Sequence, residues 1–549
     1  MHQFAFVGSH ASKTRLAECR EYSTAARCTI VDRCPLKQSL PTSRYFTSLA
    51  VAIITCLRLA GPASAADEPR SVRCELAVVG GGSGGFGSAL SAARLGVDVV
   101  LVEKSDRLGG TSVRSGVNCW EPGAGATGIP FDLYKRLKKQ PLAIGIYSFG
   151  RHGSWYNRDS EPYQYPGGET IIDPALHYLD SLQRYVPPGE TRSEAFSRRV
   201  WHGLPFEPDA MSRIMRDMLN ETGHCRVLLN TAFVKAESVE GRIASVSLSD
   251  GAVLSADHFI DATGDALLSV SAGCETMQGQ ESRERFGEPS APPEATGRVN
   301  GVSLIYRATP VTEAAVEPLP DGVPSECWWR KSFPWAQVNH YPNGDLNINI
   351  LPTMEGDEFL RVGYDAAMQE CRRRVHAHWH FWQTTYAEFR NYRLCWIAPA
   401  LGVRESRRVV GEYVLTENDL RAGFSGQKHA DIIALADHSM DTHGIHARGG
   451  EMHEPYGIPY RCLIPKGRRN LLVACRAASF SSLAASSCRL SRTMLQLGQA
   501  AGTAVALAKR QKVDLPDVPV ETLREALRVQ HVQLDHPMPD SLRNYLEEE

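Results

Sequence analysis

Two short segments of this 549-residue chain carry residue types suited to acid–base and anion chemistry. Residues 404–408 read Arg-Glu-Ser-Arg-Arg, where Arg404 and Arg407 could hold a carboxylate or another substrate oxygen through paired N–H groups. Residues 441–444 read Asp-Thr-His-Gly, and the imidazole of His443 titrates near working pH, as general acid–base catalysis requires. We predict Arg404, Arg407 and His443 as catalytic residues. The alternatives are a solvated charged surface, or pairing with the neighbouring glutamate, for the arginines, and a structural role for the histidine.

Three further histidines, His376, His378 and His380, suggest a metal site at first sight. On a helix only residues at positions i and i+4 of such a set share a face, and no nearby Asp or Glu completes a ligand set. The cysteines beyond residue 65 form no Cys-x-x-Cys pair and no Cys/His cluster with zinc-like spacing. We therefore predict no metal site.

A glycine-rich turn near residue 80 has the spacing of a phosphate-binding motif. The apolar run 74–79 (CELAVV) predicts a buried strand, which leads into the turn and then into a helix of small residues over 86–95. Gly80, Gly82 and Gly85 take the three positions of G-x-G-x-x-G, which serve the tight turn, the approach of backbone to a pyrophosphate, and close helix–strand packing. The helix then points unpaired N–H groups at the phosphates.

The residues after this turn favour a dinucleotide site over a merely flexible loop. A second apolar strand over 97–102 ends at Glu103, about 20 residues past the first glycine, where a carboxylate accepts hydrogen bonds from ribose hydroxyls. Strand, turn, helix, strand and acid follow in the order of a nucleotide-binding βαβ unit.

Several later segments resemble those of known flavoproteins. Residues 107–112 (RLGGTS) resemble the second glycine pair of glutathione-reductase-like FAD proteins, which plain NAD dehydrogenases do not share. Residues 256–265 (ADHFIDATGD) resemble a segment in which a strand returns to the sheet and its glycine turn passes the cofactor. Residues 458–465, 470–474 and 498–502 (GQAAG), together with the arginine and histidine segments above, resemble the FAD-dependent oxidoreductase family.

This resemblance covers most of residues 72–510 and implies an α/β fold with a Rossmann-like, glutathione-reductase-like FAD-binding domain and an inserted α+β substrate domain. It implies an enzyme that uses FAD to transfer a hydride between a small organic substrate and flavin N5. The electron acceptor is unknown. The predicted cofactor-binding residues are Gly80, Gly82, Ser83, Gly85, Glu103, Lys104, Gly109, Gly110, Thr111, Val234, Thr263, Gly264, Asp265, Arg476, Arg489 and Gln499.

Two positions depart from the family pattern. Relatives have glycine where this chain has Cys475, beside the expected path of the flavin, and a histidine where it has Ser482. The chemistry of that histidine is therefore in doubt here. The start of the helix after Ser486 is expected to face the pyrimidine edge of the flavin, where negative charge grows during hydride transfer, and Arg489 adds positive charge there.

The elements expected to position these residues divide the chain into seven segments. Apolar spacing predicts a helix over 208–222, alternation predicts an antiparallel excursion over 241–254, and strands over 302–307 and 346–351 predict a second sheet. An amphipathic helix is expected over 520–534. The segments are a leader with a signal peptide (1–65), three parts of the FAD-binding domain (66–130, 196–298 and 441–512), an insertion or lid (131–195), a substrate domain (299–440) and a helical tail (513–549).

Composition and the first residues bear on partners and compartment. With 43% apolar and 22% charged residues, a formal net charge of -2 and no basic run, the chain is globular and does not favour nucleic-acid binding. Residues 37–65 have the charge, apolar stretch and small residues of a secretory signal peptide. Cleavage after Ala65 would give an exported protein, periplasmic or extracellular, without a stable membrane span, whereas an uncleaved N-terminal anchor is the alternative.

Two other functions stay open at this point. The chain could be a flavin-bearing electron-transfer or binding subunit that acts only with a partner protein. It could also be an NAD-binding dehydrogenase without flavin, which residues 107–112 and the C-terminal resemblance oppose.

Overall fold

The structure is a computed structural model, and it describes residues 70–152, 167–444 and 449–547. The predicted leader, residues 1–65, lies outside the described residues, and so does part of the predicted insertion, residues 153–166. Signal-peptide cleavage therefore stays a prediction.

The first sheet confirms the predicted Rossmann-like α/β fold. Its parallel strands lie in the order β7–β2–β1–β10, and the second half of β10 pairs in parallel with β21. The first half of β10 pairs instead with the antiparallel hairpin of β8 and β9, which is the excursion expected from the alternating residues. The bounds are β1 Ser71–Val79, β2 Val99–Val102, β7 Cys225–Leu228, β8 Phe233–Val239, β9 Arg242–Leu248, β10 Val253–Asp261 and β21 Leu471–Val473. Since the carboxyl ends of parallel strands meet at one edge, the segments after β1, β2, β10 and β21 come together there.

Successive side chains of β1 point to opposite faces of this sheet, and each face has its own hydrophobic core. Leu76 and Val78 point into the larger core, with α2 (Ser83–Arg94) and α13 (Ser491–Gln511). Ala77 and Val79 point into a smaller core on the other face, with the side chains of β9. This period of two is what a strand buried on both faces requires.

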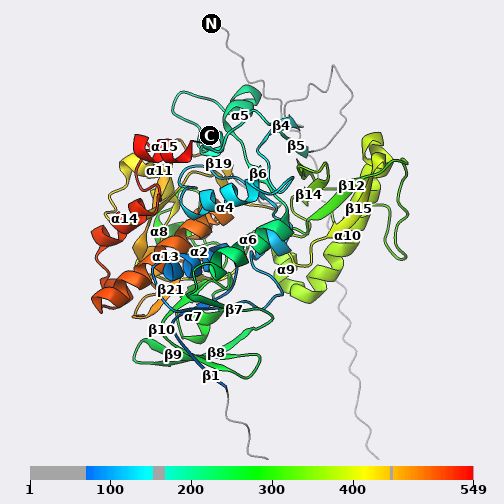
Figure 1. Cartoon of the computed structure of the whole chain (residues 1–549). Helices are drawn as coiled ribbons and strands as arrows, with labels where there is room; N and C mark the ends of the chain where they lie inside the picture. The colour runs from blue at the N-terminus through cyan, green and yellow to red at the C-terminus, as the bar shows by residue number, and fades with distance from the viewer. Residues whose placement is uncertain (1–69, 153–166, 445–448, 548–549) are drawn as a thin grey trace, which may run out of the picture. The chain divides into compact units, whose positions relative to one another are not determined.

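Small residues let helices α2 and α13 pack backbone to backbone, and Figure 1 draws them side by side in blue and orange. A Cβ placed on Gly498 would lie 2.2 Å from the carbonyl oxygen of Gly84, and one placed on Gly502 would lie 2.2 Å from that of Ser88. The Gly-Gln-Ala-Ala-Gly segment is thus explained by helix packing, because only glycine fits at these two positions.

A second, six-stranded sheet confirms the expected sheet in the region after residue 299. Its strand order is β15–β12–β14–β13–β5–β4, antiparallel except for the pair β13–β5. Helix α10 (Tyr364–Thr385) packs on it through a separate core that includes Trp379 and Trp382. The bounds are β4 Tyr147–His152, β5 Gly167–Ile172, β12 Tyr306–Pro310, β13 Ala336–His340, β14 Leu346–Ile350 and β15 Tyr392–Ile397.

Some boundaries differ from those expected. The strand expected over 302–307 begins only at Tyr306, because Val302 and Ser303 form isolated bridges instead of a ladder. The predicted insertion, residues 131–195, is divided: α4 (Ile129–Lys138) packs in the core of the first sheet, while β4 and β5 join the second.

The remaining helices and short strands precede, link or follow the strands of the two sheets. The predicted helix over 208–222 is α6, and the amphipathic helix after residue 520 is α14, which ends before the left-handed residue His531. In the described part of the chain, no helix is both long and apolar enough to cross a membrane. Bounds are α3 Thr111–Arg114, β3 Cys119–Trp120, α5 Glu194–Val200, β6 Leu204–Pro205, α6 Pro208–Asn220, α7 Leu267–Ser271, β11 Thr276–Met277, α8 Arg283–Phe286, α9 Gly356–Val362, β16 Arg408–Val409, α11 Glu417–Gly426, β17 Ile432–Ala436, β18 Met440–Asp441, β19 Gly449–Gly450, β20 Tyr456–Pro459, α12 Ser482–Cys488, α14 Val520–Val529 and α15 Asp540–Leu546.

Candidate functional site

The glycine motif forms the uncapped start of α2. Gly82 is the N-cap residue, no side chain caps it, and the first turn contains no acidic residue. The second glycine pair lies directly against this turn: Gly109 N–H donates to the Gly81 carbonyl at 2.9 Å, and a Cβ placed on Gly110 would lie 2.9 Å from Gly82 Cα. The two predicted glycine turns therefore meet, and the backbone amides at the start of α2 have no competing side-chain acceptor.

At each position of the motif, glycine is required for a different steric reason. Gly80 has φ +104°, and a Cβ on it would meet the Ala262 carbonyl oxygen at 2.3 Å. A Cβ on Gly85 would lie 1.7 Å from the Gly80 carbonyl oxygen, inside the strand–helix contact. A Cβ on Gly82 meets only Gly110 Cα, at 3.8 Å, so this position is open on the side where a phosphate group would approach. These are the three roles that the motif predicts.

Glu103 lies buried at the end of β2, beside the glycine turn. Its Oε2 accepts a hydrogen bond from Gly81 N–H at 2.6 Å, and its Oε1 accepts one from Ser105 N–H at 2.9 Å. A carboxylate has about four acceptor sites, so two stay free for ribose hydroxyls. Lys104 is exposed next to it, and Val234 lies in β8 with 58% of its side chain exposed.

The turn after β10 contacts the turn after β21. Arg476 Nη2 donates to Asp265 Oδ1 at 2.7 Å. Although burial raises the pKa of Asp265, the charge of Arg476 and hydrogen bonds from Ser406 and Arg476 outweigh it and hold that pKa below its usual value. Gly264 has φ +83° and packs against the same guanidinium, whose buried Nε has no hydrogen-bond partner. Thr263 instead donates to Asp261 at 2.8 Å, which closes the turn.

Cys475 and Gln499 have surroundings that the sequence does not reveal. Burial raises the pKa of the Cys475 thiol to about 12, so the thiol is protonated and packs beside the same turns.

Gln499 accepts a hydrogen bond from Ile129 N–H at 3.1 Å and donates to Gln530 at 3.1 Å. The structure therefore gives the Gln499 side chain a partner at the start of α4 in place of the predicted cofactor contact.

These features fit an FAD molecule. The uncapped start of α2 suits a diphosphate, buried Glu103 suits a ribose, and glycine–glycine contact keeps side chains away from both. The buried Nε atoms of the half-buried Arg476 and Arg489 have no hydrogen-bond partner, so donors remain for the polar parts of the cofactor. Thr111 begins α3 beside this region, and Ser112 Oγ donates to Ser491 Oγ at 2.8 Å, which brings the uncapped start of α13 to the same place.

A second cluster combines Arg404, Asp441, His443 and Arg489. His443 Nε2 lies 2.7 Å from Asp441 Oδ2. Arg489, in the break between α12 and α13, donates to the Asp441 carbonyl oxygen at 3.2 Å and lies 3.7 Å from the Asp441 carboxylate. Arg404 donates to the Gly301 carbonyl oxygen at 2.9 Å and to Ser303 Oγ at 3.0 Å.

The electrostatics of this cluster keep His443 neutral. Burial and the charge of Arg404 lower the pKa of His443 to about 4, against the opposing influence of Asp441. Burial and the charge of Arg489 lower the pKa of Arg404 to about 9. The carboxylate of Asp441 is ionised, because His443 and Arg489 outweigh its burial and hold its pKa below the usual range. A neutral imidazole oriented by a carboxylate can accept or donate a proton.

Residues that the sequence did not single out hold this cluster in place. Glu405 Oε2 accepts from the Asn300 side-chain amide at 2.7 Å, and Asn300 Oδ1 accepts from His443 N–H at 2.7 Å. Glu405 Oε1 accepts from Arg408 at 2.5 Å and from Ser482 Oγ at 2.7 Å. The hydroxyl at the position of the relatives' histidine therefore belongs to this network.

The arginine run divides differently from the prediction. Arg408, not Arg407, is the buried partner, and it also pairs with Glu281 at 2.5 Å. Arg407 is exposed, and the structure does not bring it into the cluster with Arg404. The reason is tertiary: Arg408 and Val409 form strand β16, which pairs with β11, and both strand residues are buried, whereas Arg407 precedes the strand.

The histidines of α10 do not form a metal site in the described residues. His378 is buried, its Nδ1 lies 2.9 Å from the Tyr306 hydroxyl, and burial lowers its pKa to about 3. No group of three His, Cys, Asp or Glu side chains among the residues with described placement could hold an ion.

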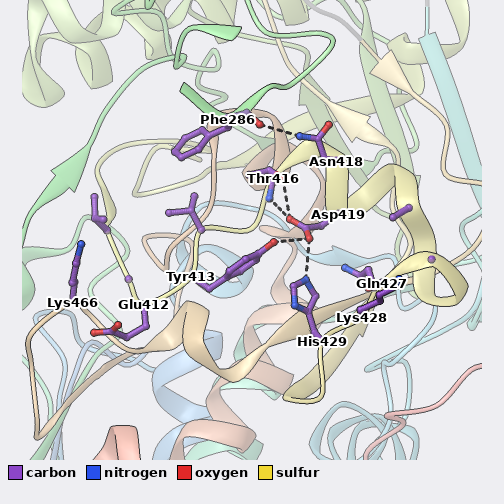
Figure 2. Close-up of a pocket in the computed structure, with 15 residues that line it drawn as sticks. Phe286, Glu412, Tyr413, Thr416, Asn418, Asp419, Gln427, Lys428, His429 and Lys466 are labelled. Carbon is purple, nitrogen blue, oxygen red and sulfur yellow. Dashed lines mark hydrogen bonds and ion pairs between the residues drawn. The ribbon is translucent and has the colours of Figure 1, made fainter. Parts of the chain in front are cut away.

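A separate open pocket of about 740 Å³ lies around α11 and contains none of the predicted site residues. Figure 2 shows Tyr413 and His429 pointing at the carboxylate of Asp419, at 2.7 and 3.0 Å. Asp419 also accepts from Thr416 N–H and Oγ1, both at 2.9 Å, which forms the capping box of α11. The geometry of these groups is therefore explained by capping of the helix.

Comparison with known proteins places most of the chain in one family. Residues 75–527 match the family model described as FAD dependent oxidoreductase. A stretch of 50 residues is 48% identical to a 3-oxosteroid 1-dehydrogenase of Rhodococcus opacus, and it spans 9% of this chain and 10% of that protein.

Two solved structures match this chain with low identity and low TM-scores. A p-nitrophenol 4-monooxygenase of Pseudomonas putida matches with a TM-score of 0.41 and 11% identity, over 87% of this chain and 90% of that one. A geranylgeranyl bacteriochlorophyll reductase-like protein of Thermoplasma acidophilum matches with a TM-score of 0.40 and 10% identity, over 87% and 96%.

Proposed function

Because this chain belongs to the family of FAD-dependent oxidoreductases, it is an enzyme with FAD as its cofactor, and we propose that it transfers a hydride between a small organic substrate and flavin N5. The observation that carries the proposal is the meeting of the uncapped start of α2 with the second glycine turn, at Gly82 and Gly110. A diphosphate is the group that such a pair of turns accommodates.

The finer assignment within the family is also part of this proposal. A parallel sheet with the β8–β9 hairpin beside β10, and a second sheet inserted before the C-terminal strand β21, supports a glutathione-reductase-like cofactor domain with an inserted α+β substrate domain. The second sheet contributes Arg404 through the bridge between Ser303 and Gly402, and the cofactor domain contributes Arg489.

Roles for the chain's own residues follow from this assignment. Bound FAD supplies a ring that accepts or gives a hydride at N5. The amides at the start of α2 hold the diphosphate, and Glu103 holds the ribose of the adenosine half. Arg489 and the uncapped start of α13 would supply positive potential to the pyrimidine edge of the bound ring. His443 exchanges the substrate proton, with Asp441 fixing the direction of its imidazole.

One experiment separates this proposal from its competitors. Purified protein is expected to be yellow and to lose its flavin absorption when a small metabolite is added anaerobically without a partner protein. A colourless preparation after correct folding would contradict the proposal. A flavin that is reduced only when a second protein is added would favour an electron-transfer subunit instead.

Export after cleavage at Ala65 is proposed from the first 65 residues, which have the charge and apolar pattern of a signal peptide. N-terminal sequencing of the exported form is expected to begin at Ala66. A protein that keeps its N-terminus and stays in the membrane fraction would contradict cleavage.

A further inference from the structure

The arginines that this protein buries or half-buries fall into two groups. Four arginines with at most 4% of the side chain exposed each contact a carboxylate: Arg184 with Glu121, Arg374 with Glu358 at 2.6 Å, Arg408 with Glu281 at 2.5 Å and Arg492 with Asp437 at 2.8 Å. Arg404 differs. Its guanidinium donates only to the uncharged Gly301 carbonyl and Ser303 hydroxyl, and within the described residues it forms no ion pair. A charge that protein encloses without a counter-ion costs free energy, so we expect Arg404 to receive a counter-ion from outside the chain.

The charges around Arg404 do not compensate it. Arg489 is a second enclosed guanidinium, and its nearest carboxylate is Asp441, at 3.7 Å. His443 is neutral, so Arg404, Arg489, Asp441 and His443 together have an excess of one positive charge. Among the outer neighbours, Asp265 pairs with Arg476, and Glu405 and Glu281 share Arg408, so the further negative charge of that group is held at Arg408 and forms no ion pair with Arg404.

The side chains of this cluster are only partly covered by the rest of the chain. Burial is the largest influence on the pKa values of Arg404, His443 and Asp441. Nevertheless 39% of the Asp441 side chain and 15% of the His443 side chain remain accessible. A ligand can therefore reach these groups, and Arg404 keeps three N–H groups for it.

We propose that Arg404 binds a carboxylate of the substrate, which completes the missing ion pair beside His443. The proposal rests on the function proposed above and names the substrate class, a small organic acid. A carboxylate gives Arg404 the counter-ion that the described residues do not provide, and it accepts two parallel N–H bonds from a guanidinium.

Calorimetric titration of the purified, flavin-loaded protein tests this. The probes are acetate, succinate and benzoate, each matched with its uncharged amide: acetamide, succinamide and benzamide. At least one carboxylate is expected to bind at least tenfold more tightly than its amide. R404M and R404Q are expected to weaken that binding at least tenfold with full flavin content, whereas R404K keeps part of it.

The matched control is R298M, which removes an exposed arginine in the segment that leads to Gly301 and is expected to bind the probes as the unchanged protein does. Flavin-loaded protein that binds no carboxylate, or binds amide and carboxylate equally, would overturn the inference and leave the proposed function standing. Loss of flavin from R404M and R404Q would overturn it too, because Arg404 would then hold the cofactor. Protein that folds without flavin would instead contradict the proposed function.

Discussion

The cofactor cradle and the cluster around Arg404 are built from different parts of the chain's chemistry. The cradle consists mainly of backbone: glycines at positions 80, 82, 85 and 110 bring amides and turns together, and one acidic side chain, Glu103, lies against them. The cluster consists of side chains on three distant segments, around residues 404, 441 and 489, and it depends on charge balance. A motif of fixed spacing encodes the first, whereas only packing of the two sheets assembles the second.

The largest expected effect comes from closing the open side of the cradle. Gly82→Leu places a side chain where a Cβ meets nothing nearer than Gly110 Cα at 3.8 Å, so the fold should tolerate it while the diphosphate loses its place. Flavin content, measured by absorption after purification, is expected to fall at least tenfold. Gly297→Leu, at a glycine with nothing within 4 Å of its Cβ, is the control and should keep its flavin. Full flavin content in a folded Gly82→Leu protein would contradict the assignment of this turn to the diphosphate.

Buried Arg408 and half-buried Arg404 should respond differently to the same substitution. Arg408→Met leaves Glu281 and Glu405 buried without their cation, so urea unfolding should show a loss of about 3–5 kcal/mol. Arg404→Met removes a cation that has no carboxylate partner, so the free energy of unfolding should change by less than about 1 kcal/mol or rise. Equal losses for both variants would mean that Arg404 is paired within the chain after all.

The depressed pKa of His443 predicts a pH dependence of stability. The unfolded histidine takes up a proton below about pH 6.5, whereas the folded one stays neutral down to about pH 4. Stability is therefore full above pH 6.5 and falls between pH 6.5 and 4, by about 2–3 kcal/mol relative to His443→Gln. Urea unfolding of both proteins at several pH values measures the difference. Parallel curves would show that His443 titrates normally and is not enclosed by the cluster.

The smallest effect concerns Gln499, which the motif assigns to the cofactor and the structure assigns to the start of α4. Gln499→Leu removes its bonds to Ile129 N–H and Gln530, and should cost about 1–2 kcal/mol of stability with flavin content unchanged. Gln530→Leu, which removes the partner side chain, should cost a similar amount. Loss of flavin from the Gln499 variant alone would return this residue to the cofactor site.

Local spacing was enough to predict the first βαβ unit, because the glycines stand at fixed positions of one strand–turn–helix, although the contact that excludes a side chain at Gly80 comes from the distant Ala262 carbonyl. The sequence pattern predicted that this helix begins at Phe86. In the structure α2 begins at Ser83, because the motif's own glycines form its first turn. It also chose Arg407 over Arg408, because the burial of a two-residue strand depends on its partner, β11, more than a hundred residues away.

By itself, the sequence determined the parallel sheet, the glycine turns, the acid at the end of β2 and, through the resemblance, the cofactor. These are short-range features, fixed by backbone sterics and by apolar periods of two and 3.6 residues. Only the tertiary structure decided that Arg408 has two carboxylates and Arg404 none, and that Asn300 and Glu405 hold His443 in place. Charge balance is a property of groups that folding brings together, and their spacing along the chain does not encode it.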